Sequence, residues 1–201
     1  MRYTKFWRMK GLEKVKLGLA LCGSYCTYSK VIAAAKDLAE KYDLTALMSE
    51  TAAGTDSRFG EAEDFIKQLE ALTGKAVIRT INGAERVGPD HMFDALVIAP
   101  CTGNTMSKLA SGITDTAVTM AAKSHLRNGG PVIIAFSTND ALSGSAPAIA
   151  ALLNRKNYYF VPFGQDDPDG KPTSLQADFT KIGETVEQAL RGKQLQPLLR
   201  K

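Results

Sequence analysis

Short apolar segments alternate with longer amphipathic segments along most of this chain, and the alternation limits the possible folds. Six apolar segments are predicted as strands, at residues 15–21, 44–48, 76–78, 95–99, 132–136 and 158–161. Five amphipathic segments are predicted as helices, at residues 29–41, 61–72, 105–126 with a break near Gly112, 146–154 and 179–190. Strands that alternate with helices form βαβ units and a mostly parallel sheet with helices on both faces. We therefore predict one doubly wound α/β domain with a six-stranded sheet.

The 201 residues divide by charge into a central domain and two basic ends. We predict a basic N-terminal extension at residues 1–14, the α/β domain at 15–191 and a basic C-terminal tail at 192–201. Much of the net charge of +4 lies at these ends, so no nucleic-acid surface is expected. No apolar segment reaches the roughly 20 residues of a membrane span, and residues 1–14 do not have the pattern of a signal peptide. Three widely spaced cysteines favour a reducing cytoplasm, and two histidines provide no metal-site spacing.

Four loops that follow predicted strands are rich in Ser, Thr, Gly and Asn. They are residues 22–25, 49–54, 100–105 and 137–140. Right-handed crossovers bring all four to one edge of the sheet. Their hydroxyl and backbone N–H groups could hold a phosphate without help from Lys or Arg, although ordinary turns have the same composition.

The kind of cofactor follows from two motifs that the sequence lacks. The spacing G-x-G-x-x-G is absent around Gly23, after the first predicted strand, and no Walker lysine pattern occurs. NAD and ATP are therefore disfavoured on this chain, and a mononucleotide such as FMN is the better hypothesis.

Three further side chains have both a chemical and a structural interpretation. Cys101 is either a nucleophile at a helix N-terminus or a small packed residue, and packing is favoured. His91 is either an acid or base or a surface loop residue, and the loop is favoured. His125 is predicted to interact favourably with a helix C-terminus as a cation.

Residues 95–136 resemble the signature region of the homo-oligomeric flavin-containing cysteine decarboxylases. That family has Ala-Pro-x-Ser-Ala-Asn-Thr, then a helix with Lys and Gly, then Gly-x-x-Asp. The corresponding residues here are Ala99-Pro100-Cys101-Thr102-Gly103-Asn104-Thr105, then Lys108, then Gly112-Ile113-Thr114-Asp115. The related flavin prenyltransferases begin this loop with Pro-Cys-Ser. The resemblance implies a Rossmann-like flavoprotein-type fold, bound FMN and a homo-oligomer.

Other segments resemble the family of dipicolinate synthase B subunits. The matching segments are residues 84–89, 136–142, 154–163, 165–168 and 171–175. This resemblance implies a partner, the A subunit of dipicolinate synthase, which would carry NAD(P). It also implies a small dicarboxylate substrate and the mother-cell cytoplasm of a spore-forming bacterium.

The resemblance assigns roles to individual residues. It places Thr102 and Asn104 at the flavin ring and the substrate, as the catalytic positions. The positions that it places around FMN are Gly23, Ser24, Ser49, Thr51, Thr105 and Asn139, and the polar loop at residues 137–140 adds Ser137 as a cofactor-binding candidate. Apart from the resemblance, the favoured mechanism uses a cation from Lys108 or Arg86 to neutralise a substrate carboxylate.

The chain also departs from the decarboxylase pattern. The catalytic His of that family would fall on Arg86, and His91 lies only three residues before Asp94. The Met that precedes the family's Asn is Thr138 here. These departures argue against cysteine decarboxylation.

Three functions remain open at this point. We favour the B subunit of dipicolinate synthase, taking part in the oxidation of a dihydrodipicolinate-type intermediate to dipicolinate during sporulation, and active only with its A-type partner. The second is a scaffold without redox chemistry that completes the active site of that partner. The third is a stand-alone FMN-dependent decarboxylase or flavin prenyltransferase.

Overall fold

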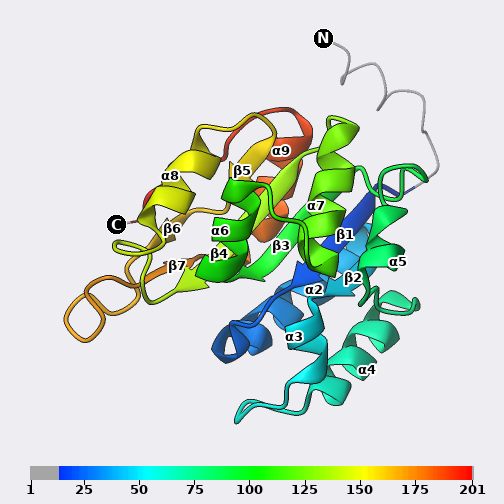
Figure 1. The fold of residues 1–201 in the computed structure, drawn as a ribbon, viewed down its shortest axis with the longest axis horizontal. Helices are drawn as coiled ribbons and strands as arrows, with labels where there is room; N and C mark the ends of the chain where they lie inside the picture. Colours follow the sequence, from blue (N-terminus) through cyan, green and yellow to red (C-terminus); the bar gives the residue numbers. More distant parts are fainter. Residues whose placement is uncertain (1–13, 201) are drawn as a thin grey trace.

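Parallel strands form the centre of the structure, a computed structural model that describes residues 14–200 (Figure 1). Their order across the sheet is β2 (Asp43–Met48), β1 (Lys16–Leu21), β3 (Ala95–Cys101), β4 (Val132–Thr138) and β5 (Tyr158–Phe160). Nearly all side chains of β1 to β4 are buried, because helices cover both faces of the sheet. The predicted doubly wound, Rossmann-like α/β fold is confirmed.

Two short antiparallel strands extend the sheet beyond the prediction. β6 (Phe163–Gly164) pairs with β7 (Leu175–Ala177), and β7 pairs with the end of β4. The sheet of the described residues therefore has seven strands rather than six. Strands of two and three residues are too short to give a periodic signal in a sequence.

The predicted strand at residues 76–78 forms only an isolated bridge. Ile78 pairs with Leu47, through hydrogen bonds to the backbone of Met48 and Ala46. The chain then leaves the sheet, because Thr80 caps the next helix, α5 (Ile81–Glu85). The prediction of a strand here is wrong.

Helices cover the two faces of the sheet unequally. One face carries α5, α6 (Gly103–Ser111), α7 (Ala117–Arg127) and α8 (Ala146–Leu153), as Figure 1 shows. The other face carries α2 (Tyr28–Lys41) and α9 (Ile182–Leu190), which pack on each other. The remaining helical segments are η1 (Tyr25–Thr27), α3 (Glu50–Gly54), α4 (Ala62–Thr73) and η2 (Phe179–Lys181).

The predicted helix at residues 105–126 is divided into α6 and α7, as its glycine indicated. Gly112 ends α6 in the left-handed region, with φ of 73°, where a residue without a side chain is favoured. Thr116 and Thr119 form a capping box that starts α7. The break places Asp115 between two helices at the carboxyl edge of the sheet.

The strand order reverses between β1 and β3, and this reversal positions the candidate site. The chain leaves β1 toward β2 on one side and leaves β3 toward β4 on the other. The loops after β1 and β3 therefore separate and leave a crevice, although the N–H of Cys22 still donates to the carbonyl of Pro100 at 3.1 Å. Ligands of open α/β sheets bind at such a switch point.

The described part of the C-terminal segment packs along the sheet edge. The N–H of Phe163 donates to Leu198, and that of Arg200 donates to Phe163. Gln194 exchanges hydrogen bonds with the backbone of Phe160. The predicted basic extension lies outside the described residues except for residue 14, and the division into three parts stays a prediction.

None of the helices within residues 14–200 is both long enough and apolar enough to cross a membrane.

Candidate functional site

A cavity of about 390 Å³ opens at the carboxyl ends of β1, β3 and β4. Three of the four predicted polar loops meet there, because parallel strands end at the same edge. Its lining consists of Ser24, Cys26, Thr102, Gly103, Asn104, Ser137, Thr138, Asn139 and Asp140. Hydroxyl and amide groups therefore dominate the cavity, as the sequence indicated.

The loop after β2 lies beside the cavity but does not line it. Ser49 is buried, and its Oγ accepts a hydrogen bond from the N–H of Ala52 at the start of α3. Thr51 is exposed, and its carbonyl accepts a hydrogen bond from the Tyr25 hydroxyl. The loops after β1 and β2 are thus joined. The role of Ser49 and Thr51 in holding a phosphate stays a prediction.

Thr102 and Thr105 form the N-terminal turn of α6. Thr102 Oγ1 accepts from the N–H of Thr105 at 3.1 Å and donates to Thr105 Oγ1 at 3.0 Å. Both hydroxyls are thus engaged in capping the helix. Asn104, which lies between them, is exposed to the cavity and forms no hydrogen bond with the described residues. Of the predicted catalytic pair, Asn104 is the side chain free to contact a ligand.

The loops after β1 and β4 are tied together by their own residues. Ser24 Oγ donates to the carbonyl of Ser137 at 2.8 Å. Thr173 Oγ1 donates to the carbonyl of Asn139 at 2.6 Å and leaves the exposed amide of Asn139 facing the cavity opening. Gly23 precedes Ser24 and is half-buried. These bonds hold the predicted cofactor-binding positions in a fixed arrangement.

Asp140 is a residue of the cavity that the sequence analysis did not assign. Its Oδ1 accepts hydrogen bonds from Thr138 Oγ1 at 2.5 Å and from Ser145 Oγ at 2.9 Å. Both bonds lower the pKa of the Asp140 carboxyl, and the bond from Thr138 has the larger effect. An ionised carboxylate therefore lies in a cavity whose lining has no Lys or Arg among the described residues. The cavity suits hydrogen-bond donors near Asp140 rather than a phosphate.

Gly103 is required by the closeness of these side chains. A Cβ at this position would overlap Ser145 Oγ and would lie 2.9 Å from Thr138 Oγ1. The decarboxylase pattern has Ala where this chain has Gly103. Ser145 and the hydrogen-bonded pair of Thr138 and Asp140 crowd this turn, which explains why Gly stands here in place of Ala.

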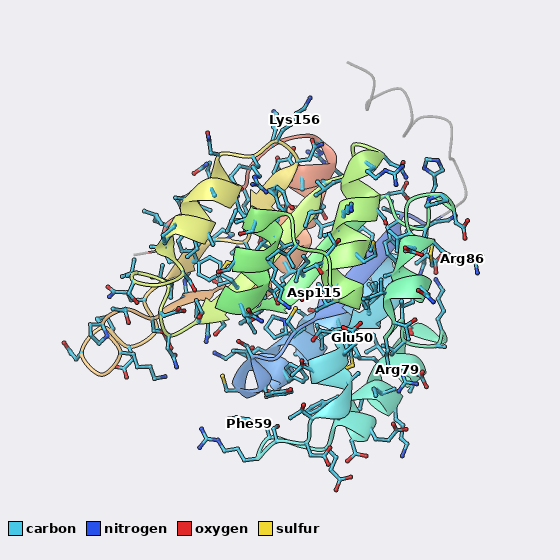
Figure 2. All side chains as sticks on the ribbon, in the orientation of Figure 1. Glu50, Phe59, Arg79, Arg86, Asp115 and Lys156 are labelled. Atoms are coloured by element: carbon cyan, nitrogen blue, oxygen red, sulfur yellow. The ribbon has the colours of Figure 1, made fainter. Side chains whose placement is uncertain are left out.

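An ion pair and a carboxylate cap lie beside the cavity. Lys108 Nζ is 2.9 Å from both carboxylate oxygens of Asp115, and this hydrogen bond lowers the pKa of Asp115. Glu50 accepts hydrogen bonds from the N–H of Ala117 at the start of α7. Figure 2 shows Glu50 and Asp115 close together at this edge. Lys108 and Asp115 occupy the Lys and Gly-x-x-Asp positions of the family pattern.

Arg86 and the two histidines lie away from the cavity. Arg86 pairs with Asp90 at 2.8 Å, and Figure 2 shows it far from Asp115. His91 contacts Asn128, which follows the C-terminus of α7 at the amino edge of the sheet. Arg86 therefore does not neutralise a ligand in this cavity, and only Lys108 retains that predicted role.

The buried histidine and cysteines have structural roles. His125 is 2% exposed, and burial lowers its pKa to about 4, so it is neutral near pH 7 rather than a cation at the end of α7. Its Nε2 bonds the carbonyl of Pro131 at 3.2 Å. Burial raises the pKa of Cys22 to about 11 and raises that of Cys101 as well. A buried thiol with a raised pKa is a poor nucleophile, so Cys101 is a packed residue.

Comparison with known proteins gives consistent matches along the chain. The flavoprotein family model matches residues 8–156. The chain is 43% identical over 192 residues to the B subunit of dipicolinate synthase of Bacillus subtilis, covering 95% of this chain and 96% of that protein. The chain belongs to the flavoprotein family, among the dipicolinate synthase B subunits.

Solved structures agree with this membership. The crystal structure of the dipicolinate synthase B subunit from Bacillus halodurans superposes with a TM-score of 0.85 at 41% identity, covering 94% of this chain and 99% of that one. The FMN-dependent cysteine decarboxylase SpaF has the same fold, with a TM-score of 0.67 at 22% identity, covering 87% of this chain and 97% of that one.

The cavity fits a flavoprotein ligand through neutral donors. Asn104 and Asn139 present amides, and Ser137 presents a hydroxyl that donates to no described residue, so these groups can donate to the polar atoms of a flavin nucleotide without cations. The hydroxyls of Ser24, Thr102 and Thr138 already donate within the protein. The anionic group of such a nucleotide would have to avoid Asp140, which favours the side of the site near Ser24 and the loop after β2. The residues present therefore fit a flavin in an orientation that keeps its phosphate away from Asp140.

Proposed function

We propose that this chain acts in dipicolinate synthase by holding a dihydrodipicolinate-type intermediate while it is oxidised to dipicolinate. The observation that carries the proposal is a preformed amide- and hydroxyl-lined cavity at the switch point of a chain similar over 95% of its length to a dipicolinate synthase B subunit. The setting would be the mother-cell cytoplasm of a sporulating bacterium, and the partner would be the A subunit of the synthase, carrying NAD(P).

The oxidation removes a hydride and a proton from the ring. Because the product is aromatic, the step needs a hydride acceptor more than a strong base. A bound FMN would supply a two-electron acceptor. Asn104 would orient a substrate carboxylate, and Thr102 would fix the turn that presents Asn104. Lys108, further along the same helix α6 and paired with Asp115, would supply positive charge.

The residues that would hold FMN come from the four loops. Ser24, Ser49 and Thr51 would face its phosphate, together with the backbone at Gly23. Thr105, Ser137 and Asn139 would border the rest of the cofactor. Ser24 and Ser137 are joined by a 2.8 Å hydrogen bond in which the Ser24 hydroxyl donates its one proton. This side of the site is therefore preformed, and Ser24 would offer the phosphate its backbone N–H rather than its hydroxyl.

A substitution at Asn104 tests the proposal. We expect Asn104→Ala to lower synthase activity with the A-type partner at least tenfold, because about 1.4 kcal/mol of lost transition-state binding gives that factor. Asn82→Ala, an exposed Asn on α5, is the matched control and should keep full activity. Full activity of Asn104→Ala would exclude the role of Asn104.

One observation favours the scaffold as a second candidate. Asp140 is ionised inside a cavity without a basic lining residue among those described, and it repels a phosphate dianion. The visible spectrum separates the two functions. A stoichiometric flavin spectrum in the active complex supports oxidation on this chain, and a colourless active complex supports the scaffold.

The stand-alone decarboxylase or prenyltransferase has less support. Neither His91 nor His125 lies at the cavity, so the chain's own histidines provide no acid or base there. Activity of this chain without any partner would revive that interpretation.

We also propose that the chain forms a homo-oligomer, as the resemblance to the flavin-containing decarboxylases implies.

A further inference from the structure

An exposed aromatic residue is presented on an ordered turn after α3. Phe59 is 46% exposed, and Figure 2 shows it at the tip of a turn that extends from the body of the molecule. Ser57 and Gly60 close the turn with backbone hydrogen bonds of 3.0 and 3.1 Å. The N–H of Phe59 also donates to Ser57 Oγ at 3.2 Å. The exposed ring is therefore held in place by the fold.

The turn and the first turn of α4, residues 56–64, form what we call the acidic turn. It has four exposed carboxylates and one guanidinium, that of Arg58. None of these carboxylates forms an ion pair with a residue that the structure describes. Arg58 instead lies over the Phe59 ring at 4.9 Å. The carboxylates are Asp56, Glu61, Glu63 and Asp64.

A groove of opposite charge lies near the other edge of the sheet. This basic groove has a volume of about 450 Å³ and runs over α6, α7 and the segment before β5. Its apolar part includes Leu109, Leu126, Tyr158 and Ile113, which is 47% exposed. Its rim carries Lys123, Arg127 and Arg155, and no carboxylate of the described residues lines it.

The cations of the groove are poorly compensated within one copy of the chain. Lys123 and Arg127 are four residues apart on α7, where like charges repel. Neither forms an ion pair among the described residues, whereas the Arg155 guanidinium donates to the carbonyls of Leu109 and Ala110. A ligand for this groove would therefore combine negative charge with an apolar group.

We infer that the acidic turn of one copy of the chain docks in the basic groove of a second copy. Phe59 would enter the apolar part beside Ile113, and the carboxylates of the turn would face Lys123 and Arg127. An aromatic anchor in an apolar pocket is the usual centre of an interface, and complementary charge sets its orientation. The inference rests on the homo-oligomer proposed above and adds the residues that build it.

The position of the two surfaces sets the symmetry. The acidic turn lies next to α4 at the β2 edge, whereas the basic groove lies toward β5 at the opposite edge (Figure 1). A contact between different surfaces is head-to-tail, so each copy can bind one neighbour through its turn and another through its groove. Such contacts give a ring when the rotation between neighbours closes and an open filament when it does not.

One substitution on each of the two surfaces tests this interface, with the molecular mass of the protein in solution as the readout. We expect Phe59→Asp and Ile113→Asp each to weaken self-association at least tenfold in sedimentation equilibrium of the full chain. Leu142→Asp is the matched control, since Leu142 is 53% exposed but belongs to neither surface. Circular dichroism and urea unfolding check that each variant folds.

Mixing the two variants gives a sharper test. The Ile113→Asp copy keeps its turn, and the Phe59→Asp copy keeps its groove, so an equimolar mixture should form a dimer and nothing larger. Likewise, Lys123→Glu with Arg127→Glu should dissociate the oligomer. A mixed-in copy with Glu61→Lys and Glu63→Lys should then restore assemblies larger than the dimer, because the dimer needs only the one unaltered turn and groove.

Two results would overturn the inference in distinguishable ways. A wild-type chain that is monomeric at all concentrations would reject both the homo-oligomer and this interface. An oligomer that both aspartate variants leave intact would keep the homo-oligomer and reject the interface. Neither result depends on flavin binding or on synthase activity, so the proposed redox function is judged separately.

Discussion

Gly103 shows how one residue adapts the flavoprotein turn to this chain. Its missing Cβ leaves room for the hydroxyls of Ser145 and Thr138, which bond Asp140. We expect Gly103→Ala to lower the free energy of unfolding by about 1–3 kcal/mol, the usual range for overpacking. Urea unfolding measures the effect.

Ser145, whose hydroxyl lies closest to a Cβ at position 103, supplies the control for this prediction. Ser145→Ala removes the nearest atom, so the double variant Gly103→Ala/Ser145→Ala should lose less stability than the two single changes added together. Additive losses would mean that the contact with Ser145 is not the cause.

Asp140 gives a second prediction for a single side chain. Thr138→Val removes the hydrogen bond that most lowers the pKa of Asp140, so this pKa should rise toward its ordinary value of 3.8. Because the folded-state pKa is depressed, the ionised form stabilises the native state above the ordinary pKa. That stabilisation is lost as pH falls through the folded-state value. A carboxyl-detected NMR titration of both proteins checks the direction, and an unchanged pKa would contradict it.

Among the secondary-structure elements, Glu50 joins the turn after β2 to the start of α7. Its carboxylate accepts from the N–H of Ala117 at 3.1 and 3.2 Å, in the helix-dipole position that favours an anion. We expect Glu50→Ala to destabilise the fold by about 1 kcal/mol, as the loss of a helix cap does. Glu85→Ala, an exposed Glu at the end of α5, should change stability by less than about 0.5 kcal/mol in the same urea unfolding.

The packing of α7 on the sheet gives a pH prediction. His125 has a folded-state pKa of about 4 against an ordinary 6.5, because burial disfavours its cation. As pH falls, His125 is protonated in the unfolded chain before it is protonated in the folded chain. Its contribution to the free energy of unfolding is therefore fully present above pH 6.5 and is lost as pH falls toward 4. At roughly 1.4 kcal/mol per unit of pKa shift, the full loss is about 3–4 kcal/mol.

His125→Gln isolates this effect. An amide can still donate to the carbonyl of Pro131 but does not titrate, so the free energies of unfolding near neutral pH and in mild acid should differ less than in the wild type. An equal pH dependence in both proteins would assign the acid sensitivity to other groups.

For the molecule as a whole, a bound ligand should raise the melting temperature. If the switch-point site binds FMN, a concentration about 100 times the dissociation constant stabilises the native state by about 2.7 kcal/mol. Riboflavin, which lacks the phosphate, is the matched control and should give a smaller shift in the same thermal titration. No shift with FMN, even with the A-type partner present, would favour the scaffold function.

The architecture could be read from the order of residues alone. The alternation of apolar and amphipathic segments predicted the five parallel strands, with one false strand at residues 76–78, and Gly112 marked the division between α6 and α7. Polar residues at three strand ends defined the cavity, because parallel strands bring their carboxyl ends together. Local periodicity and turn chemistry carry this information, so no tertiary contact was needed to read it.

Other features depend on long-range contacts and became visible only in three dimensions. The pairing of β6 with β7, the anchoring of Ala117 by Glu50 and the burial that neutralises His125 join residues far apart in the chain or depend on packing. Arg86 could be excluded from the cavity only once its position at the opposite edge was known. Hydrogen bonds, burial and charge depend on neighbours in space, and a sequence pattern records only neighbours along the chain.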